Sequence, residues 1–241
     1  MERRTAARTA VVWDAVRALL EDGDSSEQGV LDIGGGTGGL AVRVAAQGHR
    51  VTVIDPSPDA LAALARRADE EDVADRVTGL QGDLGTLRDL APEGGVDLVL
   101  CHGVLGLVDD PAVALATITS VLRPGGALSL LVNQRHAAVL ARAMAGHFVQ
   151  AREILTGEQS DHAKDRGEHR FTAEEVAQLL GSAGFTATTT HGIRIFADLV
   201  PSSLLDLEPG ASAALLELER AVAERPEYLA LASQLHVIAT R

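Results

Sequence analysis

The stretch Val30-Leu31-Asp32-Ile33-Gly34-Gly35-Gly36-Thr37-Gly38-Gly39 decides the fold of this 241-residue chain. Residues 29–33 have the length and the flanking turn signals of a buried strand, and residues 40–45 carry the apolar face of a helix. The glycines between them allow a turn with positive φ and let a ligand lie against the main chain. The stretch therefore predicts a strand, a ligand-binding loop and a helix whose first N–H groups point at the ligand.

Two classes of cofactor bind to glycine loops of this kind, and the spacing of the glycines fits both. Gly34, Gly36 and Gly39 match the dinucleotide pattern G-x-G-x-x-G, whereas Gly34, Gly36 and Gly38 match the G-x-G-x-G of S-adenosylmethionine (SAM) enzymes. Asp32 favours SAM, because a carboxylate at this point would repel a pyrophosphate but could hold the ammonium group of SAM. We therefore interpret the stretch as the SAM loop of a class I methyltransferase.

Three further polar residues follow predicted strands at positions where such folds bind the cofactor. Asp55 ends the second predicted strand, about twenty residues past the glycine loop, where an acid contacts the ribose hydroxyls. Asp83 follows the third, and in SAM enzymes an acid there accepts a hydrogen bond from the adenine amino group. His102 follows the fourth. Because ligands lie outside the carboxyl ends of parallel strands, we expect His102 to border the sulfonium or the methyl acceptor.

Strand and helix patterns alternate along the chain, which predicts an α/β fold with a doubly wound, mostly parallel, seven-stranded Rossmann-like sheet. We expect a single domain over residues 1–241, with an N-terminal helical lid (1–28) and a substrate-capping helical insertion after the fifth strand (134–170). Helix starts are predicted at Ser57-Pro58, at Asp110-Pro111 and at the capping box Thr172-Ala173-Glu174-Glu175. The predicted strands are 29–33, 51–54, 76–81, 96–101, 127–132, 185–196 and 235–240, and the predicted helices include 5–21, 136–155 and 211–223.

Composition limits the cellular setting and the partners. The chain is 46% hydrophobic, so it can bury one sizeable core, and its single cysteine, Cys101, cannot form an internal disulfide. It shows neither a signal peptide nor an apolar run that could span a bilayer, so we expect a cytoplasmic protein without membrane contacts. No metal site is predicted, and the oligomeric state is left open.

The net charge of −13 argues against a general nucleic-acid-binding surface, because phosphates are contacted largely by Lys and Arg. The charge is unevenly distributed. Residues 135–170 hold six cations, five anions and four of the eight histidines, which makes this stretch +1 and the remainder −14. An acidic ligand, if one is bound, is expected there.

Four segments of the chain resemble a specific family. They are Leu100-Cys101-His102-Gly103-Val104-Leu105, residues 120–130, Met144-Ala145-Gly146-His147-Phe148 and His191-Gly192-Ile193-Arg194-Ile195-Phe196. They are similar to the tRNA 5-carboxymethoxyuridine methyltransferases, and a weaker match runs from Arg8 to the C-terminus. The resemblance implies SAM-dependent methylation of a carboxylate on a modified wobble uridine of tRNA. It also implies that the cofactor is contacted by Arg8, Gly35, Gly36, Asp55, Asp83, Leu84 and His102, with Arg8 reaching the cofactor from the N-terminal helix.

Two departures from the family pattern lie where the acceptor should bind. The family has Tyr-Asn-Ala-His after the fifth strand, whereas Asn133-Gln134-Arg135-His136 keeps only the histidine, and Glu158-Gln159-Ser160-Asp161-His162 replaces a lysine-rich run of some members. A SAM-dependent methyltransferase that acts on a small carboxylic acid or hydroxyl compound is therefore an alternative to the tRNA enzyme. A non-catalytic SAM-binding module and an NAD-dependent oxidoreductase are further alternatives.

The type of acceptor determines which residues the chemistry needs. A carboxylate is already ionised at neutral pH, so it needs no general base, and we expect Arg194, with Arg135 or His136, to orient it. A hydroxyl acceptor would need a base, for which His102 or His136 is the candidate. The two hypotheses differ in pH dependence, because a histidine base would give a rate that rises with pH below the pKa of that histidine.

Overall fold

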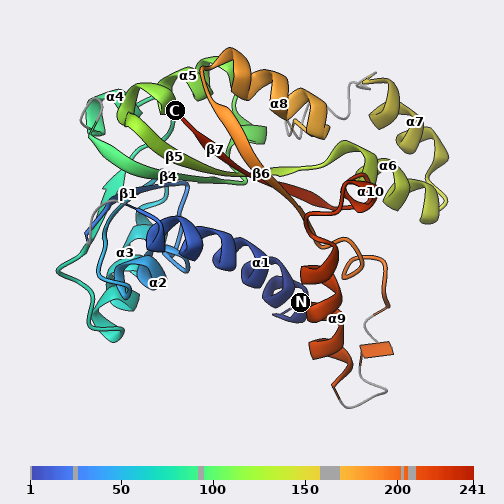
Figure 1. The fold of residues 1–241 in the computed structure, drawn as a ribbon, viewed down its shortest axis with the longest axis horizontal. Coiled ribbons are helices and arrows are strands. Elements are labelled where there is room, and N and C mark those ends of the chain that lie inside the picture. The colour runs from blue at the N-terminus through green and yellow to red at the C-terminus, as the bar shows by residue number, and fades with distance from the viewer. Residues whose placement is uncertain (1, 24–26, 92–94, 158–168, 202–203, 206–209) are drawn as a thin grey trace.

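A seven-stranded sheet forms the centre of the molecule (Figure 1). The structure is a computed structural model; it describes residues 2–241 except 24–26, 92–94, 158–168, 202–203 and 206–209, with side chains described from residue 10 onward. The strand order is β3-β2-β1-β4-β5-β7-β6, in which β1 to β5 are parallel and β7 is antiparallel to both β5 and β6. The strands are β1 (Gly29–Ile33), β2 (Arg50–Asp55), β3 (Val77–Gln81), β4 (Val96–His102), β5 (Leu122–Asn133), β6 (Thr186–Ile193) and β7 (Gln234–Thr240). This confirms the predicted mostly parallel, seven-stranded α/β sheet.

Helices cover both faces of the sheet, as Figure 1 shows. The helices are α1 (Glu2–Glu21), α2 (Ala41–Ala45), α3 (Pro58–Glu70), α4 (Leu87–Leu90), α5 (Pro111–Val121), α6 (Arg135–Met144), α7 (Phe148–Thr156), α8 (Ala173–Ser182), α9 (Ala211–Val222) and α10 (Pro226–Leu229). One buried cluster joins α5 and α8, through Leu115 and Val176, to one face of the strands. A second joins α1, α2 and α3, through Val16, Val42 and Leu64, to the other face. Because β1 and β4 are covered on both faces, their sequences are nearly all apolar.

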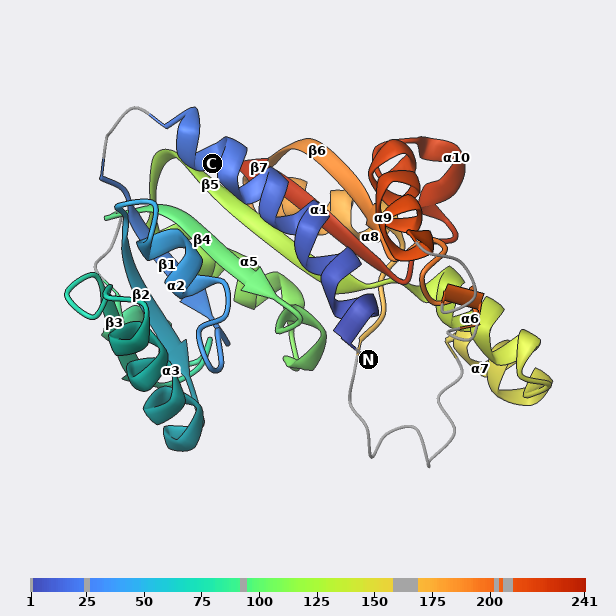
Figure 2. The same ribbon diagram turned by 90° about the horizontal axis from the view of Figure 1, so that it is seen from below.

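Helix α1 crosses the sheet on the same side as α2 and α3, and Figure 2 shows it running alongside β4, β5 and β7. Its side chains Val12, Val16 and Leu20 are buried in the second cluster. The guanidinium of Arg43 on α2 lies 4.2 Å from the ring centre of Trp13, a cation–π contact that connects the two helices. From residue 10 onward, α1 is therefore a fixed part of the core.

The predicted helix starts are confirmed by their hydrogen bonds. The Ser57 hydroxyl accepts from the Ala60 N–H at 3.2 Å, and the Asp110 carboxylate accepts from two N–H groups at the start of α5. Thr172 and Glu175 form the expected reciprocal capping box. These interactions involve residues two or three positions apart, so the local sequence is enough to specify them.

Other boundaries differ from the predictions for identifiable reasons. The helix expected over 136–155 is two helices, α6 and α7, because Gly146 between them has a φ of +78°. Strand β5 begins at Leu122, before the predicted 127, because Leu122 already pairs with Val96 ahead of an irregularity in the ladder. Strand β6 ends at Ile193, before the predicted 196, where Arg194 adopts a φ of +57°. Residues 158–168 of the expected insertion (134–170), which include the departure at 158–162, lie outside the described residues.

Candidate cofactor and acceptor site

The predicted site residues follow one edge of the sheet. The register aligns Asp55 with Gln81, Ile33 with both Ile54 and Cys101, and His102 with Leu131. It further aligns Asn133 with Gln234 and Gln234 with Ile193, so β6 ends at the same edge as the parallel strands. The edge therefore carries, from one side to the other, Asp83, Asp55, the glycine loop, His102, the Arg135-His136 pair and Arg194. The strand order reverses between β1 and β4, which is where open α/β sheets bind ligands.

The glycine loop is a close-packed turn between β1 and α2. Its first N–H, on Gly34, donates to the Ile54 carbonyl at 2.7 Å, and the φ angles of Gly34, Gly36 and Gly38 are all positive. A Cβ on Gly35 would lie 2.5 Å from Asp32 Oδ2, so only glycine lets the loop fold over that carboxylate. Helix α2 has only five residues, so a ligand would be held by the loop backbone more than by a helix dipole.

Asp55 holds the glycine loop with its own carboxylate. Its Oδ2 accepts from the Gly36 N–H and its Oδ1 from the Ser57 N–H, both at 2.9 Å. The residue is only 8% exposed. Each carboxylate oxygen has a second lone pair, so Asp55 can accept from ribose hydroxyls while it still holds the loop.

Asp32 is the buried acid of the site. It lies under Gly35 and is 3% exposed. Burial, and next the negative charge of Asp55, raise the pKa of Asp32 to about 7. A cationic group placed beside it would offset both effects. The raised pKa and the glycine cradle above it fit the ammonium end of SAM.

The third acid occupies a different environment. Asp83 is exposed, and its Oδ1 accepts from the Gly85 and Thr86 N–H groups at 2.9 and 3.1 Å, which fixes the turn after β3. Leu84 next to it is buried in the core. The structure thus presents the Asp83 carboxylate at the edge of the sheet beside an anchored neighbour.

His102 ends β4 and is half-buried. Its Nε2 lies 2.8 Å from the Ser129 hydroxyl on β5, and that hydroxyl lies 2.7 Å from Nε2 of His236 on β7. Neither Ser129 nor His236 was expected at the site from the sequence. The available signal was a polar residue flanked by apolar ones in each of two mostly apolar strands, Ser129 in 127–132 and His236 in 235–240.

Arg194 lies directly after β6. Its Nη2 is 3.3 Å from Asp198 Oδ2, while its Nε is buried and has no hydrogen-bond partner among the described residues. The loop that follows it is held by Glu219 on α9, a buried carboxylate that accepts the N–H groups of Ile195, Phe196 and Ala197 at 2.7 to 2.9 Å. Glu219 was also missed, because on sequence alone it resembles any other acid of an amphipathic helix.

Arg135 and His136 start α6 but differ in their surroundings. Arg135 Nη1 donates to Glu175 Oε1 at 2.8 Å and Nη2 donates to the Arg170 carbonyl at 3.0 Å, so its guanidinium joins α6 to α8. Burial raises the pKa of Glu175, but the hydrogen bond from the Thr172 N–H and then the interaction with Arg135 outweigh it, so the pKa of Glu175 is lowered overall. His136 is exposed. Arg8 lies in α1, and its side chain is outside the described part of the structure.

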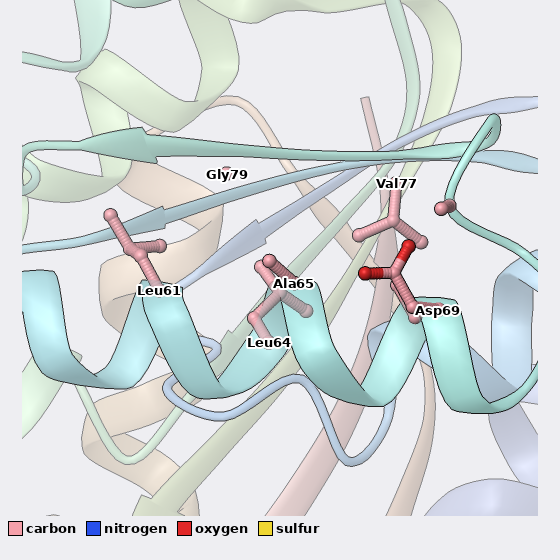
Figure 3. A pocket seen from close by; sticks show the side chains of 8 residues that line it. Leu61, Leu64, Ala65, Asp69, Val77 and Gly79 are labelled. Atoms are coloured by element: carbon pink, nitrogen blue, oxygen red, sulfur yellow. The ribbon is translucent and has the colours of Figure 1, made fainter.

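Two hollows lie away from this edge. The first hollow is lined mainly by aliphatic residues of α3 and β3, with Asp69 as its single acid. Figure 3 shows Leu61, Leu64 and Val77 among the residues that line this hollow. The other lies between α1, β6 and α9 and is lined by Asp14, His191, Arg220 and Glu224 among others. Within the described residues, no helix is long and apolar enough to cross a membrane, and no group of three or more His, Cys, Asp or Glu side chains could hold a metal ion.

The fold and the edge residues define the class of protein, a class I SAM-dependent methyltransferase, and comparisons with known proteins support it. A family model for a methyltransferase domain matches residues 30–126. A crystal structure of a SAM-dependent methyltransferase from Mesorhizobium loti superposes with a TM-score of 0.62 at 21% identity, covering 95% of this chain and 97% of that one. A Burkholderia thailandensis N-methyltransferase bound to S-adenosylhomocysteine superposes at 0.56, also at 21% identity, covering 99% of this chain and 78% of that one.

A sequence relative narrows the assignment. The tRNA 5-carboxymethoxyuridine methyltransferase of Escherichia coli K12 is 31% identical over 242 residues, which is 97% of this chain and 88% of the relative. The ubiquinone biosynthesis O-methyltransferase of Xanthomonas euvesicatoria is 34% identical over 168 residues, which is 68% of this chain and 65% of that protein. The chain belongs to the tRNA 5-carboxymethoxyuridine methyltransferase family. The cofactor is SAM, and the oxidoreductase and non-catalytic alternatives are not retained.

Proposed function

We propose that the protein methylates the carboxylate of 5-carboxymethoxyuridine at the wobble position of tRNA, in the cytoplasm. The similarity to the Escherichia coli enzyme supports this, because it spans 97% of the chain and thus both the glycine loop and Arg194. The similarity to the Xanthomonas O-methyltransferase covers a smaller part of both proteins.

In this proposal, the first half of the edge holds SAM, which supplies the methyl group. Asp32 holds its ammonium group and Asp55 its ribose hydroxyls. Asp83 accepts from the adenine amino group, and the Leu84 N–H lies beside the ring. Arg8 and His102 contact the remaining part of the cofactor.

The observation that supports a carboxylate acceptor is the state of Arg194. Its Nε–H is buried without a partner among the described residues, and its Nη2 already lies near one carboxylate, Asp198. A substrate carboxylate would satisfy the unpaired donor, and a guanidinium can hold it in a bidentate geometry. An ionised carboxylate attacks without losing a proton, so the task of these residues is alignment rather than base catalysis.

A small carboxylic acid is the second candidate, and Arg135 favours it. Arg135 is engaged with Glu175 and the Arg170 carbonyl. It therefore contributes less positive surface for binding an anionic RNA than the sequence suggests. The net charge of −13 points the same way.

The experiment is a methyl-transfer assay with radiolabelled SAM, offered bulk tRNA from cells that lack the modification enzyme or a small-molecule extract of the same cells. We expect label in tRNA, in the methyl ester of 5-carboxymethoxyuridine after digestion to nucleosides. We expect Arg194→Lys to lower kcat/KM about tenfold to a hundredfold, because a charge-assisted pair contributes about 1.5–3 kcal/mol, while the SAM Kd stays unchanged. Arg220→Lys, whose arginine lies on α9 and pairs with Asp14 of α1, is the matched control. Label only in the small-molecule fraction would contradict the tRNA assignment.

A further inference from the structure

A buried polar cluster lies behind His102, inside an otherwise apolar layer. It contains Ser129, His236 and His191, which come from β5, β7 and β6. Leu128 and Leu130, the neighbours of Ser129, belong to the core cluster on the side of the sheet covered by α5 and α8. Because successive side chains of a strand point to opposite faces, the Ser129 hydroxyl points to the side covered by α1. Ser129 and His236 are both 0% exposed. The proposed function gives this cluster no role.

The proton on His236 can be placed from its surroundings. Burial, and next the proximity of His102 and His191, lower the pKa of His236 well below its usual value, so the ring is neutral and carries one N–H. Its Nδ1 is buried and has no hydrogen-bond partner among the described residues, whereas its Nε2 lies 2.7 Å from the Ser129 hydroxyl. A buried N–H without an acceptor is rare. The proton is therefore on Nε2, where it is donated to Ser129.

The proton of Ser129 follows from this. A hydroxyl has a single proton, and its oxygen is already accepting from His236. The hydroxyl therefore donates in the other direction, to Nε2 of His102 at 2.8 Å. For this, Nε2 of His102 must offer a lone pair, which excludes the imidazolium form and the tautomer protonated at Nε2.

We propose that Ser129 and His236 are positioning residues that hold His102 as the neutral imidazole protonated at Nδ1, which makes His102 a hydrogen-bond donor to the cofactor and prevents it from acting as a general base. The contact between His102 and the cofactor rests on the proposed function, whereas the tautomer rests on the cluster alone. His191 stacks on His236 with ring centres 5.4 Å apart, and its Nε2 lies 3.5 Å from Glu224 Oε1. Burial lowers the pKa of His191, which limits the positive charge facing His236.

This arrangement has a chemical consequence for the choice of acceptor. A neutral His102 presents no positive charge to a sulfonium cofactor. With Nε2 occupied by Ser129 and Nδ1 already protonated, the ring has no nitrogen that can take a proton from a hydroxyl acceptor. The cluster thus favours an acceptor that arrives ionised.

The first test measures the tautomer in the ligand-free protein. Histidine is labelled with ¹⁵N and the ring nitrogens are observed by long-range ¹H–¹⁵N NMR at pH 8, with assignment by His102→Asn and His236→Asn. We expect Nε2 of His102 to be unprotonated and Nδ1 protonated, with the reverse in His236. We expect Ser129→Ala to shift His102 towards the Nε2-protonated form. A wild-type His102 protonated at Nε2 would overturn the proposal.

The second test asks whether Ser129 acts through His102. The SAM Kd is measured for the wild type, Ser129→Ala, His102→Asn and the double variant. We expect Ser129→Ala to weaken binding severalfold on its own and to have no effect in the His102→Asn background. Ser120→Ala, which removes a hydroxyl bonded to the Thr117 carbonyl on α5, is the matched control and should leave the Kd unchanged.

The outcomes of the second test separate the two proposals. An equal loss of affinity from Ser129→Ala in both backgrounds would show a purely structural role and overturn the positioning role. An unchanged Kd in His102→Asn alone would instead remove the cofactor contact assumed in the proposed function, while the NMR result would still decide the tautomer.

Discussion

At the level of single residues, the pKa of Asp32 links the stability of the protein to its cofactor. In the folded protein this pKa is raised to about 7 from 3.8, first by burial and then by the charge of Asp55. The folded state therefore keeps a proton that the unfolded chain loses, and the free energy of unfolding decreases as pH rises from about 4 to 7. Above pH 7, where Asp32 is ionised in both the folded and the unfolded state, the free energy of unfolding stays lower by the full amount.

Asp32→Asn removes this effect from the ligand-free protein. Relative to wild type, we expect the variant to be more stabilised at pH 8 than at pH 5 by about 3 kcal/mol, since pH 5 lies about two units below the folded pKa and each unit is worth about 1.4 kcal/mol. Urea unfolding at the two pH values measures the difference. The same variant should bind SAM more weakly at pH 8, and wild-type affinity should fall below pH 7 as Asp32 takes up its proton. A stability gain that is equal at both pH values would contradict the shifted pKa.

Asp55 has two tasks, since it holds the Gly36 and Ser57 N–H groups and is expected to hold the ribose. We expect Asp55→Ala to weaken SAM binding at least about tenfold, because hydrogen bonds to an ionised group contribute about 1.5–3 kcal/mol each. Isothermal titration calorimetry measures the loss. Asp59→Ala, an exposed acid in the first turn of α3, is the control. Unchanged affinity in Asp55→Ala with an intact circular dichroism spectrum would remove the ribose assignment.

At the level of elements, the packing of α1 restricts the predicted lid, residues 1–28, to the first turns of that helix. From residue 10 onward α1 is fixed by Val12, Val16 and Leu20 and by the stacking of Arg43 on Trp13, so SAM has little left to order there. We expect hydrogen exchange to slow on SAM binding in residues 2–9, which include Arg8, and to stay unchanged over 12–20. Arg8→Ala should abolish the slowing. Equal protection of residues 2–9 with and without SAM would argue against a lid.

The elements also show what the sequence could and could not predict. Strand β1 was predicted at its exact bounds because an apolar run closed by glycines is an unambiguous signal. The caps at Ser57, Asp110 and Thr172 were predicted because each depends on neighbouring residues. The hydrogen bonds of Ser129 and His236 to each other, and of Glu219 to the loop at 195–197, join residues that are far apart in sequence. Only the three-dimensional sheet brings them together.

At the level of the whole molecule, the charge distribution makes a prediction about salt. The exposed cations Arg142 and Arg152 lie on α6 and α7, within the stretch 135–170, which has a net charge of +1. If they provide two phosphate contacts, raising salt from about 50 to 200 mM should weaken tRNA binding about tenfold. Removing both cations by Arg142→Ala and Arg152→Ala should abolish most of this salt dependence, as measured by fluorescence anisotropy. Arg66→Ala with Arg88→Ala, both exposed elsewhere, should preserve it.

The position of β7 has a consequence for how the protein is made. The strand comes last in the described chain yet lies between β5 and β6, and β6 hydrogen-bonds to β7 and not to β5 in the described sheet. Strands β1 to β5 can pair in the order in which they leave the ribosome, whereas β6 must wait for a partner that is translated later. The nascent chain would therefore first assemble the strands that carry the proposed cofactor residues. Strand β6, which places Arg194 at the site, would join the sheet only when synthesis reaches β7.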